Sequence, residues 1–253
     1  MRLENKTAII TGAGDLDGIG AAIAQGYSRE GAKVVIADIQ DGSDVVSKLE
    51  ENGGEAIFVK TNVTDREDCA ALVGATIDEF GGVDVLVNNA AKFKGLTTSF
   101  MDISASEWNS VMEVNTGGPF NCIQAVCPVM MKNNRGKIIN TASSTVFEGA
   151  PMSPHYVASK GAVIALTRSL ARALGGAGIN VNTLAPGFTQ TSAGKMMQEN
   201  VGVPIEEILL QMRSLKRTPT ADDLVGTAIF LASDDSDFMT GQVLLCDGGV
   251  SFN

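Results

Sequence analysis

KTAIITGAGDLDGIGAAIAQGYSREGAKVVIAD, residues 6–38, is the stretch that decides the fold of this chain. Residues 6–10 and 33–38 are short runs rich in β-branched side chains, and each predicts a buried strand. Between them a glycine-rich turn leads into a helical pattern that ends near Gly31. Glycines let a backbone approach a ligand closely, and the free amides at a helix start attract pyrophosphate. This strand–turn–helix–strand order therefore predicts nucleotide binding. The turn residues that we expect at the nucleotide are Gly12, Gly14, Asp17, Gly18, Ile19 and Gly20.

Asp38 ends the second of these strands. A carboxylate at this position accepts hydrogen bonds from ribose hydroxyls and repels a 2′-phosphate. Asp15 and Asp17 add negative charge to the turn, and no Arg or Lys stands in the turn or directly after Asp38. The pattern favours NAD(H) over NADP(H). The alternative interpretation of Asp38 is a solvated strand end.

The alternation of strands and helices continues to the end of the chain. We predict further strands at 55–60, 83–87, 137–140, 179–184 and 242–246, and helices at about 66–80, 104–115, 119–132 and 154–174. Repeated strand–helix units predict an α/β fold with a doubly wound parallel sheet and helices on both faces. No linker or repeat interrupts the chain, so we predict one domain, residues 1–253. Ligands bind at the carboxyl ends of such strands, near the switch in strand order.

Two polar breaks in this pattern have more than one interpretation. Asn88 and Asn89 follow a predicted strand, where they brace neighbouring strands, line an adenosine pocket or form an ordinary turn. Residues 115–119, NTGGP, separate two predicted helices and place the polar side chain of Asn115 in the middle of the core.

Residues 140–160 contain side chains that can transfer a proton, a function that the glycines of the turn do not provide. Tyr156 and Lys160 lie four residues apart in a helical pattern, so they share one face of the helix. A nearby ammonium group favours the phenolate and lowers the pKa of a tyrosine from about 10. A serine hydroxyl at the end of the preceding strand meets both across the loop. Together these groups suit acid–base work on a carbonyl or an alcohol. Taken alone, the Tyr–Lys spacing is also that of an ordinary helix face.

Composition limits the partners of the chain. Its formal net charge of −10 argues against nucleic acid and anionic membrane surfaces, which both need a basic face. No apolar run reaches the ~18 residues of a membrane span, and the start of the chain has no signal-peptide pattern. The four cysteines form no Cys-x-x-Cys pair, and the single histidine leaves little material for a metal site or a Ser-His-Asp triad. We expect a cytoplasmic protein with reduced thiols and no metal.

With these residues assembled, the chain resembles the short-chain dehydrogenase/reductase family over essentially its full length. The motifs that carry the resemblance are the glycine-rich turn, Asn88-Asn89-Ala90, Asn115, Ser143, Tyr156-x-x-x-Lys160 and Pro186-Gly187. Ser143 precedes Tyr156 by 13 residues, the spacing typical of the family. The resemblance implies a seven-stranded Rossmann sheet and an assembly of four or two identical subunits.

The resemblance also implies a role for each motif residue. Tyr156 is the general acid in ketone reduction and the base in alcohol oxidation. Lys160 lowers the pKa of Tyr156 and binds the nicotinamide ribose, Ser143 holds the substrate oxygen, and Asn115 supports a water in the proton relay. Pro186, Gly187 and Thr189 flank the nicotinamide. We also expect Asn62, Val63, Asn89 and Ala90 at the cofactor, together with Tyr156 and Lys160.

Two departures from the family pattern stand out. The family turn is usually Thr-Gly-x-x-x-Gly-x-Gly, whereas five residues separate Gly12 from Gly18 here. The turn is two residues longer, so we expect a reshaped loop at residues 13–17. Ala91 stands where the family usually has glycine, and we expect little effect.

The substrate side is predicted less sharply. Residues 188–217 carry apolar side chains at near-helical spacing, which fits a mobile lid or a helix pair packed on the core or on a neighbouring subunit. We expect a neutral secondary alcohol and its ketone, and cyclic, sugar-like and aromatic compounds are the candidates. The alternative is a 3-oxoacyl thioester reductase, which needs a basic patch, and whose NADPH preference conflicts with Asp38. The local candidates for this basic patch are Lys92, Lys94 and Lys195. A non-catalytic nucleotide-binding module would lack Ser, Tyr or Lys of the motif, and all three are present.

Overall fold

The computed structural model describes residues 1–93, 97, 99–201 and 204–252. In this part of the chain, seven parallel strands form one sheet in the order β3-β2-β1-β4-β5-β6-β7. The strands are β1 (Thr7–Thr11), β2 (Lys33–Asp38), β3 (Ala56–Lys60), β4 (Val85–Asn88), β5 (Gly136–Thr141), β6 (Ile179–Pro186) and β7 (Val243–Cys246). The order reverses between β1 and β4, which confirms the predicted doubly wound fold. Because all strands are parallel, their carboxyl ends meet at one edge.

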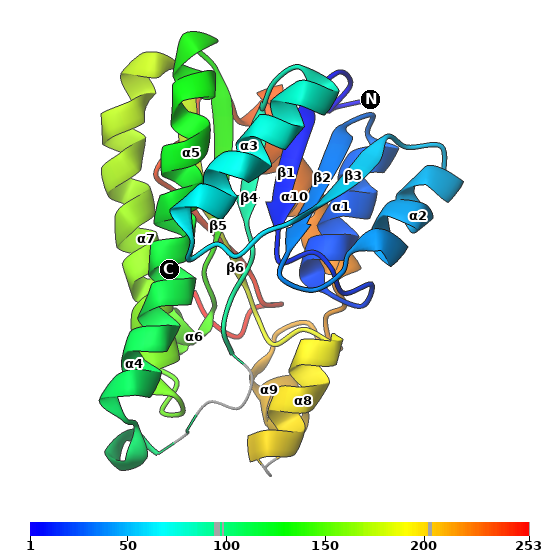
Figure 1. Ribbon diagram of the computed structural model, residues 1–253. Helices are drawn as coiled ribbons and strands as arrows, with labels where there is room; N and C mark the ends of the chain where they lie inside the picture. The colour runs from blue at the N-terminus through cyan, green and yellow to red at the C-terminus, as the bar shows by residue number, and fades with distance from the viewer. Residues whose placement is uncertain (94–96, 98, 202–203, 253) are drawn as a thin grey trace.

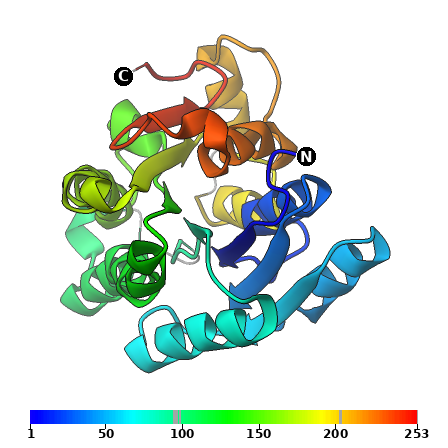
Figure 2. The same ribbon diagram turned by 90° about the horizontal axis from the view of Figure 1, so that it is seen from above.

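Helices cover both faces of the sheet (Figures 1 and 2). Successive strand residues point to opposite faces. Accordingly, Ile10 joins a core with α1 (Ile19–Arg29), α2 (Ser43–Glu51) and α10 (Asp222–Ala232). Its neighbour Ile9 joins the other core, with helices α3, α5 and α7. The bounds of these three helices are Arg66–Phe80, Gly118–Lys132 and Pro154–Leu174.

The predicted break at residues 115–119 is not an interruption. Helix α4 (Ala105–Met112) continues through a wider π-helical turn, η2 (Glu113–Gly117), directly into α5. Such turns occur frequently at functional sites. Asn115 lies within this turn and is buried, as its position in the sequence predicted.

Other parts of the chain are more ordered than the sequence predicted. The loop after Ser143 contains a short helix, α6 (Thr145–Glu148), and α2 and α10 are also additional. Residues 188–217 form two helices, α8 (Ser192–Val201) and α9 (Ile205–Met212), beyond the carboxyl ends of the strands (Figure 1). Residues 202–203 and Lys94 lie outside the described residues. A helix pair is therefore confirmed, and the lid motion stays a prediction.

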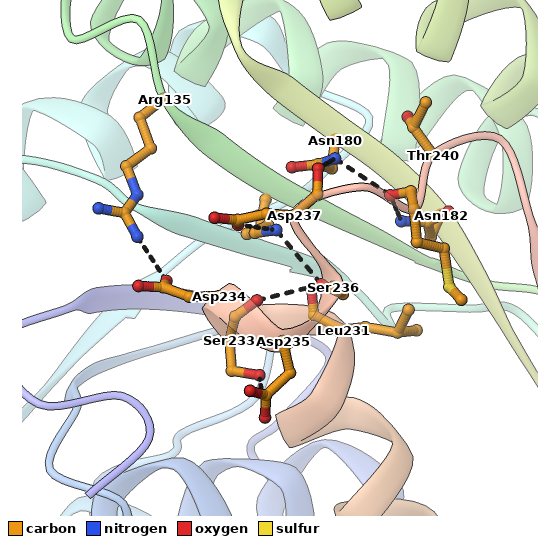
Figure 3. A network of polar contacts seen from close by, with 12 residues as sticks. Arg135, Asn180, Asn182, Leu231, Ser233, Asp234, Asp235, Ser236, Asp237 and Thr240 are labelled. Atoms are coloured by element: carbon orange, nitrogen blue, oxygen red, sulfur yellow. Dashed lines mark hydrogen bonds and ion pairs between the residues drawn. The ribbon is translucent and has the colours of Figure 1, made fainter.

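A polar network ties the segments at the amino-terminal end of the sheet (Figure 3). Arg135, just before β5, pairs with Asp234 in the turn η4 (Asp234–Ser236). The buried ammonium of Lys137 lies 2.7 Å from a carboxylate oxygen of Asp237. Asn180 donates to the Asp237 carbonyl at 2.9 Å. These contacts fix the connection between α10 and β7 at the end of the sheet opposite the predicted site.

Within the described residues, no helix has the length and apolar character that a membrane span requires. The same residues contain no group of three or more His, Cys, Asp or Glu side chains arranged for a metal ion. All four cysteines are free thiols.

Candidate active site

The glycine-rich turn is packed so closely that side chains would not fit. Gly12 has a φ of +65°, and a Cβ there would lie 2.5 Å from the Ala90 Cα atom. A Cβ on Gly20 would lie 2.6 Å from the Gly12 carbonyl oxygen and 2.8 Å from the Ala13 Cα atom. These neighbours are backbone atoms, so they cannot turn aside as a flexible side chain would. Positions 12 and 20 of the turn therefore require glycine.

Asn89 braces this turn from the end of β4. Its side-chain amide donates to the carbonyls of Thr11 at 3.1 Å and Gly12 at 2.7 Å. The Thr11 hydroxyl in turn accepts from the amides of Asn89 and Ala90. Asn88 similarly joins β4 to β5 by donating to Asn140 at 2.8 Å. Thr11 was not among the predicted site residues, because its contacts connect positions 78 and 79 residues away.

The turn, which is two residues longer than the family pattern, forms a compact loop at residues 15–18, and residues 15–17 are exposed. The Gly18 amide donates to the Asp15 carbonyl at 2.8 Å, and the Asp17 amide donates to the Asp15 carboxylate at 3.1 Å. Helix α1 then begins at Ile19, and no side chain caps its amino terminus. The first amides of a helix lack partners within the helix. The close-packed glycines and the uncapped helix start thus fit a pyrophosphate group.

Asp38 holds the turn against the end of β2. Its Oδ2 accepts from the Gly14 amide at 2.9 Å, and its Oδ1 accepts from the Gln40 amide at 3.0 Å. The residue remains partly exposed. Asp38 is therefore fixed beside the glycine-rich turn, rather than standing free in solvent at a strand end.

Replacing Gly20 with alanine is expected to disturb both folding and nucleotide binding. The new Cβ would meet backbone on two sides, and overpacking of this kind costs about 1–3 kcal/mol. The matched control is Gly74→Ala on α3, where a Cβ would have no neighbour within 4 Å. It should stabilise the protein by about 0.5–1 kcal/mol. Urea unfolding measures the stability of each variant, and titration with NADH measures its nucleotide binding. Equal effects of the two substitutions would contradict the close packing at Gly20.

Ser143, Tyr156 and Lys160 come together at the carboxyl end of β5. Tyr156 and Lys160 project from the first two turns of α7, and Ser143 follows β5 by two residues. Ser143 lies near enough to Tyr156 to lower the pKa of its phenol. The Lys160 ammonium lies 5.7 Å from the centre of the Tyr156 ring and donates to the Thr141 carbonyl at 2.8 Å. Thr145 also donates to the Ser143 hydroxyl, at 2.9 Å.

Burial controls the charges of this group. It raises the pKa of Tyr156 to about 12, against the lowering effect of the nearby Ser143, although Tyr156 stays partly exposed. Burial lowers the pKa of Lys160 to about 8. The expected net lowering of the Tyr156 pKa by Lys160 is thus not found. At neutral pH the arrangement presents a protonated phenol beside an ammonium group.

The buried ammonium of Lys160 predicts a specific dependence of stability on pH. Its pKa is about 8 in the folded protein and 10.5 ordinarily. Between these values unfolding takes up a proton, so stability rises with pH across this window, by about 3 kcal/mol in all. Below pH 8 both states hold the proton and this contribution is flat. Other groups titrate in the same range, so wild type is compared with Lys160→Met. Urea unfolding should show that the free energy of unfolding of the wild type rises, relative to that of Lys160→Met, between pH 7 and pH 10. If the difference between the two proteins stayed constant, the low pKa of Lys160 would be contradicted.

Asn115 is connected to the same helix. Its Oδ1 accepts from the Lys92 amide at 2.6 Å, and its Nδ2 donates to the Ser159 hydroxyl at 3.0 Å. Ser159 donates in turn to the Tyr156 carbonyl at 2.7 Å. The π-helical turn therefore fixes the segment after β4 and the first turns of α7 together.

The remaining predicted residues follow the ends of β3 and β6. The Gly187 amide donates to the Cys246 carbonyl at 3.0 Å, just after Pro186, and the buried Thr189 donates to the Gly187 carbonyl at 2.8 Å. Val63 is buried and Asn62 is exposed, with the Asn62 side chain accepting from the Thr64 amide. These residues thus lie at or just after the carboxyl ends of β3 and β6.

Known proteins match this chain along nearly its whole length. The sequence model described as Enoyl-(Acyl carrier protein) reductase matches residues 12–251. Galactitol 2-dehydrogenase from Agrobacterium fabrum is 40% identical over 98% of this chain and 98% of its own. A 3-oxoacyl-(acyl-carrier-protein) reductase from Thermotoga maritima is 37% identical over 99% of both chains. The crystal structure of levodione reductase is similar with a TM-score of 0.93 at 28% identity, over 98% of both chains.

Proposed function

Because this chain belongs to the short-chain dehydrogenase/reductase family, we propose that it interconverts a secondary alcohol and its ketone with NAD(H). The observation that carries the proposal is the group formed by Ser143, Tyr156 and the buried Lys160. It combines a proton donor, a hydroxyl for the substrate oxygen and a fixed ammonium group at the carboxyl edge of the sheet.

In ketone reduction, Tyr156 donates its proton to the substrate oxygen while Ser143 holds that oxygen by a hydrogen bond. The ammonium of Lys160 stabilises the phenolate that is left. In alcohol oxidation the proton moves in the opposite direction. The bound nicotinamide supplies or accepts the hydride at the substrate carbon. Since the pKa of Tyr156 is about 12, the phenol is protonated at neutral pH, and this favours reduction there.

The chain's own residues support NAD(H) as the preferred cofactor. The glycines at positions 12 and 20 and the start of α1 would accommodate the pyrophosphate, and Asp38, fixed beside the turn, would accept hydrogen bonds from the ribose hydroxyls. Its carboxylate would lie against the 2′-phosphate of NADP(H). Pro186, Gly187 and Thr189 would flank the nicotinamide, and Asn62, Val63 and Ala90 would border the adenosine side.

We take the α8–α9 segment as the substrate side and propose a small, hydroxylated substrate. A cavity of about 160 Å³ lies in this segment. Its lining is mainly polar: Phe188, Gln190, Lys195, Gln198, Glu199 and Glu206. Such a lining suits a sugar-like alcohol, in agreement with the galactitol dehydrogenase relative. The net charge of −10 argues against nucleic acid and anionic membranes as partners.

We further propose a cytoplasmic homo-oligomer, a tetramer or a dimer. The large apolar side chains of Trp108 on α4 and of Phe120 and Met131 on α5 are 42%, 37% and 49% exposed. Contact with other subunits would cover such side chains. The Cys69 and Cys122 thiols form a hydrogen bond at 3.7 Å and are not joined by a disulfide; a reducing compartment would keep them so.

The second candidate is reduction of a 3-oxoacyl thioester. It is favoured by the Thermotoga maritima relative and by the description of the matching sequence model. The ammonium of Lys92 donates to the Ser110 hydroxyl at 2.8 Å and remains exposed, and Lys195 lines the cavity in the α8–α9 segment. These two lysines are the described candidates for contact with an acyl carrier.

A substrate panel distinguishes the two candidates. Purified protein is assayed with neutral secondary alcohols, their ketones, polyols and 3-oxoacyl thioesters, each with NAD(H) and with NADP(H). The proposal expects turnover of the alcohols, polyols or ketones with NAD(H). Turnover confined to thioesters or to NADPH would favour the second candidate.

A further inference from the structure

The start of α7 is held in place from outside the helix. Ser153, the residue before the helix, has a φ of +50°, a backbone conformation that residues with side chains adopt rarely. Its hydroxyl donates to the Thr97 carbonyl at 3.3 Å. His155, directly before Tyr156, is fully buried. The segment that carries Tyr156 thus depends on contacts from other parts of the chain.

Glu107 on α4 provides the central contact. Its Oε1 lies 3.0 Å from the Nε2 atom of His155 and accepts from the Thr97 amide at 2.7 Å. Its Oε2 accepts from the Thr97 hydroxyl, also at 2.7 Å. The Ser104 hydroxyl accepts from the Glu107 amide and caps α4 at this point. One carboxylate therefore joins α4, the segment at Thr97 and the start of α7.

This contact has a defined protonation state. The hydrogen bonds from Thr97, and then His155, hold the pKa of Glu107 below its usual range, so Glu107 is a carboxylate at neutral pH. A carboxylate only accepts hydrogen bonds, so the Nε2 atom of His155 carries the proton that it shares with Glu107. Among the described residues, the buried Nδ1 atom of His155 has no hydrogen-bond partner. The contact with Glu107 is thus the one polar contact of the ring in that part of the chain.

We propose that Glu107 is a positioning residue for the reaction: through His155 and Thr97 its carboxylate fixes the start of α7, and with it the hydroxyl of Tyr156 beside Ser143. The Tyr156 amide donates to the Ser153 carbonyl at 2.9 Å, so Tyr156 follows the helix start directly. Proton transfer is sensitive to displacement of its donor. The inference rests on the proposed function of Tyr156.

The kinetic test replaces Glu107 with glutamine, which keeps the size of the side chain but supplies one acceptor oxygen instead of two. We expect kcat/KM for the ketone to fall about tenfold or more, since displacements of about 1 Å can cost 100-fold. The Kd for NADH should change less than about twofold, a difference below 0.5 kcal/mol. Glu113→Gln is the matched control, because it removes the same charge from an exposed position in the adjoining π-helical turn.

A spectroscopic test reads the same contacts without turnover. The chain has one histidine and two tyrosines, so ¹⁵N-histidine labelling gives one imidazole and ¹³Cζ-tyrosine labelling gives two signals. Glu107→Gln should shift the imidazole signals of His155 and the signal of Tyr156, and leave that of Tyr27 in place. Glu113→Gln should shift none of them.

The outcomes separate the inference from the proposed function. A shifted His155 signal with an unchanged Tyr156 signal and unchanged kcat/KM would overturn the inference, leaving Glu107 a purely structural role. If the wild type turned over no substrate, the proposed function would fail, and the Tyr156 signal alone would decide the inference. If Glu107→Gln did not fold, His155→Gln, which keeps a donor, should retain more activity than His155→Leu. Equal activities of His155→Gln and His155→Leu would likewise overturn the positioning role of Glu107.

Discussion

Tyr156→Phe is expected to lower kcat in both directions by about 10²–10⁴-fold, because it deletes the group that transfers the proton. The ring remains, so the packing of α7 and the position of Lys160 should be kept. The Kd for NAD(H) is therefore expected to stay close to that of the wild type. Initial rates with the best substrate, together with a fluorescence titration of NADH, measure the two quantities separately.

Tyr27→Phe is the matched control for this result. Tyr27 is fully buried on α1, and its hydroxyl donates to the Ala228 carbonyl at 2.9 Å. Losing that hydrogen bond should cost about 1 kcal/mol of stability and leave turnover unchanged. Full activity of Tyr156→Phe, or an equal loss in both variants, would refute the acid–base role of Tyr156.

Asp38→Ala is expected to change the cofactor preference. Hydrogen bonds to a charged group contribute about 1.5–3 kcal/mol, so the ratio of kcat/KM for NADPH to that for NADH should rise about tenfold to 100-fold. Part of the rise comes from weaker NADH binding and part from removal of repulsion against the 2′-phosphate. Asp38 also accepts from the Gly14 amide, so some loss of stability is expected as well.

Asp17→Ala is the control that distinguishes a specific contact of Asp38 with the cofactor from the general effect of negative charge in the turn. It removes one negative charge from the exposed part of the same turn, where the Asp17 backbone contact with Asp15 does not involve the Asp17 side chain. We expect a much smaller change in the cofactor ratio. Equal changes in the two variants, or none in Asp38→Ala, would show that the longer turn sets the preference.

Much of the fold could be predicted because it depends on local patterns. The strands follow short β-branched runs, and α7 spans the predicted residues 154–174. By contrast, α10 was not predicted. Its six buried side chains leave little amphipathic contrast, because it packs against both α1 and the sheet. The Gly117-Gly118-Pro119 sequence suggested a break, whereas α4 and α5 stay continuous through a π-helical turn.

The site divides in the same way. The sequence predicted that Ser143, Tyr156 and Lys160 lie together, because Ser143 follows a clear strand pattern and the other two share one helix face. The charge state of Tyr156 could not be predicted from the sequence, because the effect of burial on its pKa depends on neighbours that only the fold brings together. The pair of Glu107 and His155 joins residues 48 positions apart, which no local pattern reveals.

The most direct test of the proposed reaction follows an isotope. A ketone that the enzyme reduces is incubated with NADH that carries deuterium at both C4 positions of the nicotinamide, and the product alcohol is examined by mass spectrometry and NMR. We expect one deuterium on the carbinol carbon, and we expect the wild type to form this product rapidly and Tyr156→Phe to form it far more slowly. A product without deuterium at that carbon, or equal rates for the two proteins, would contradict it.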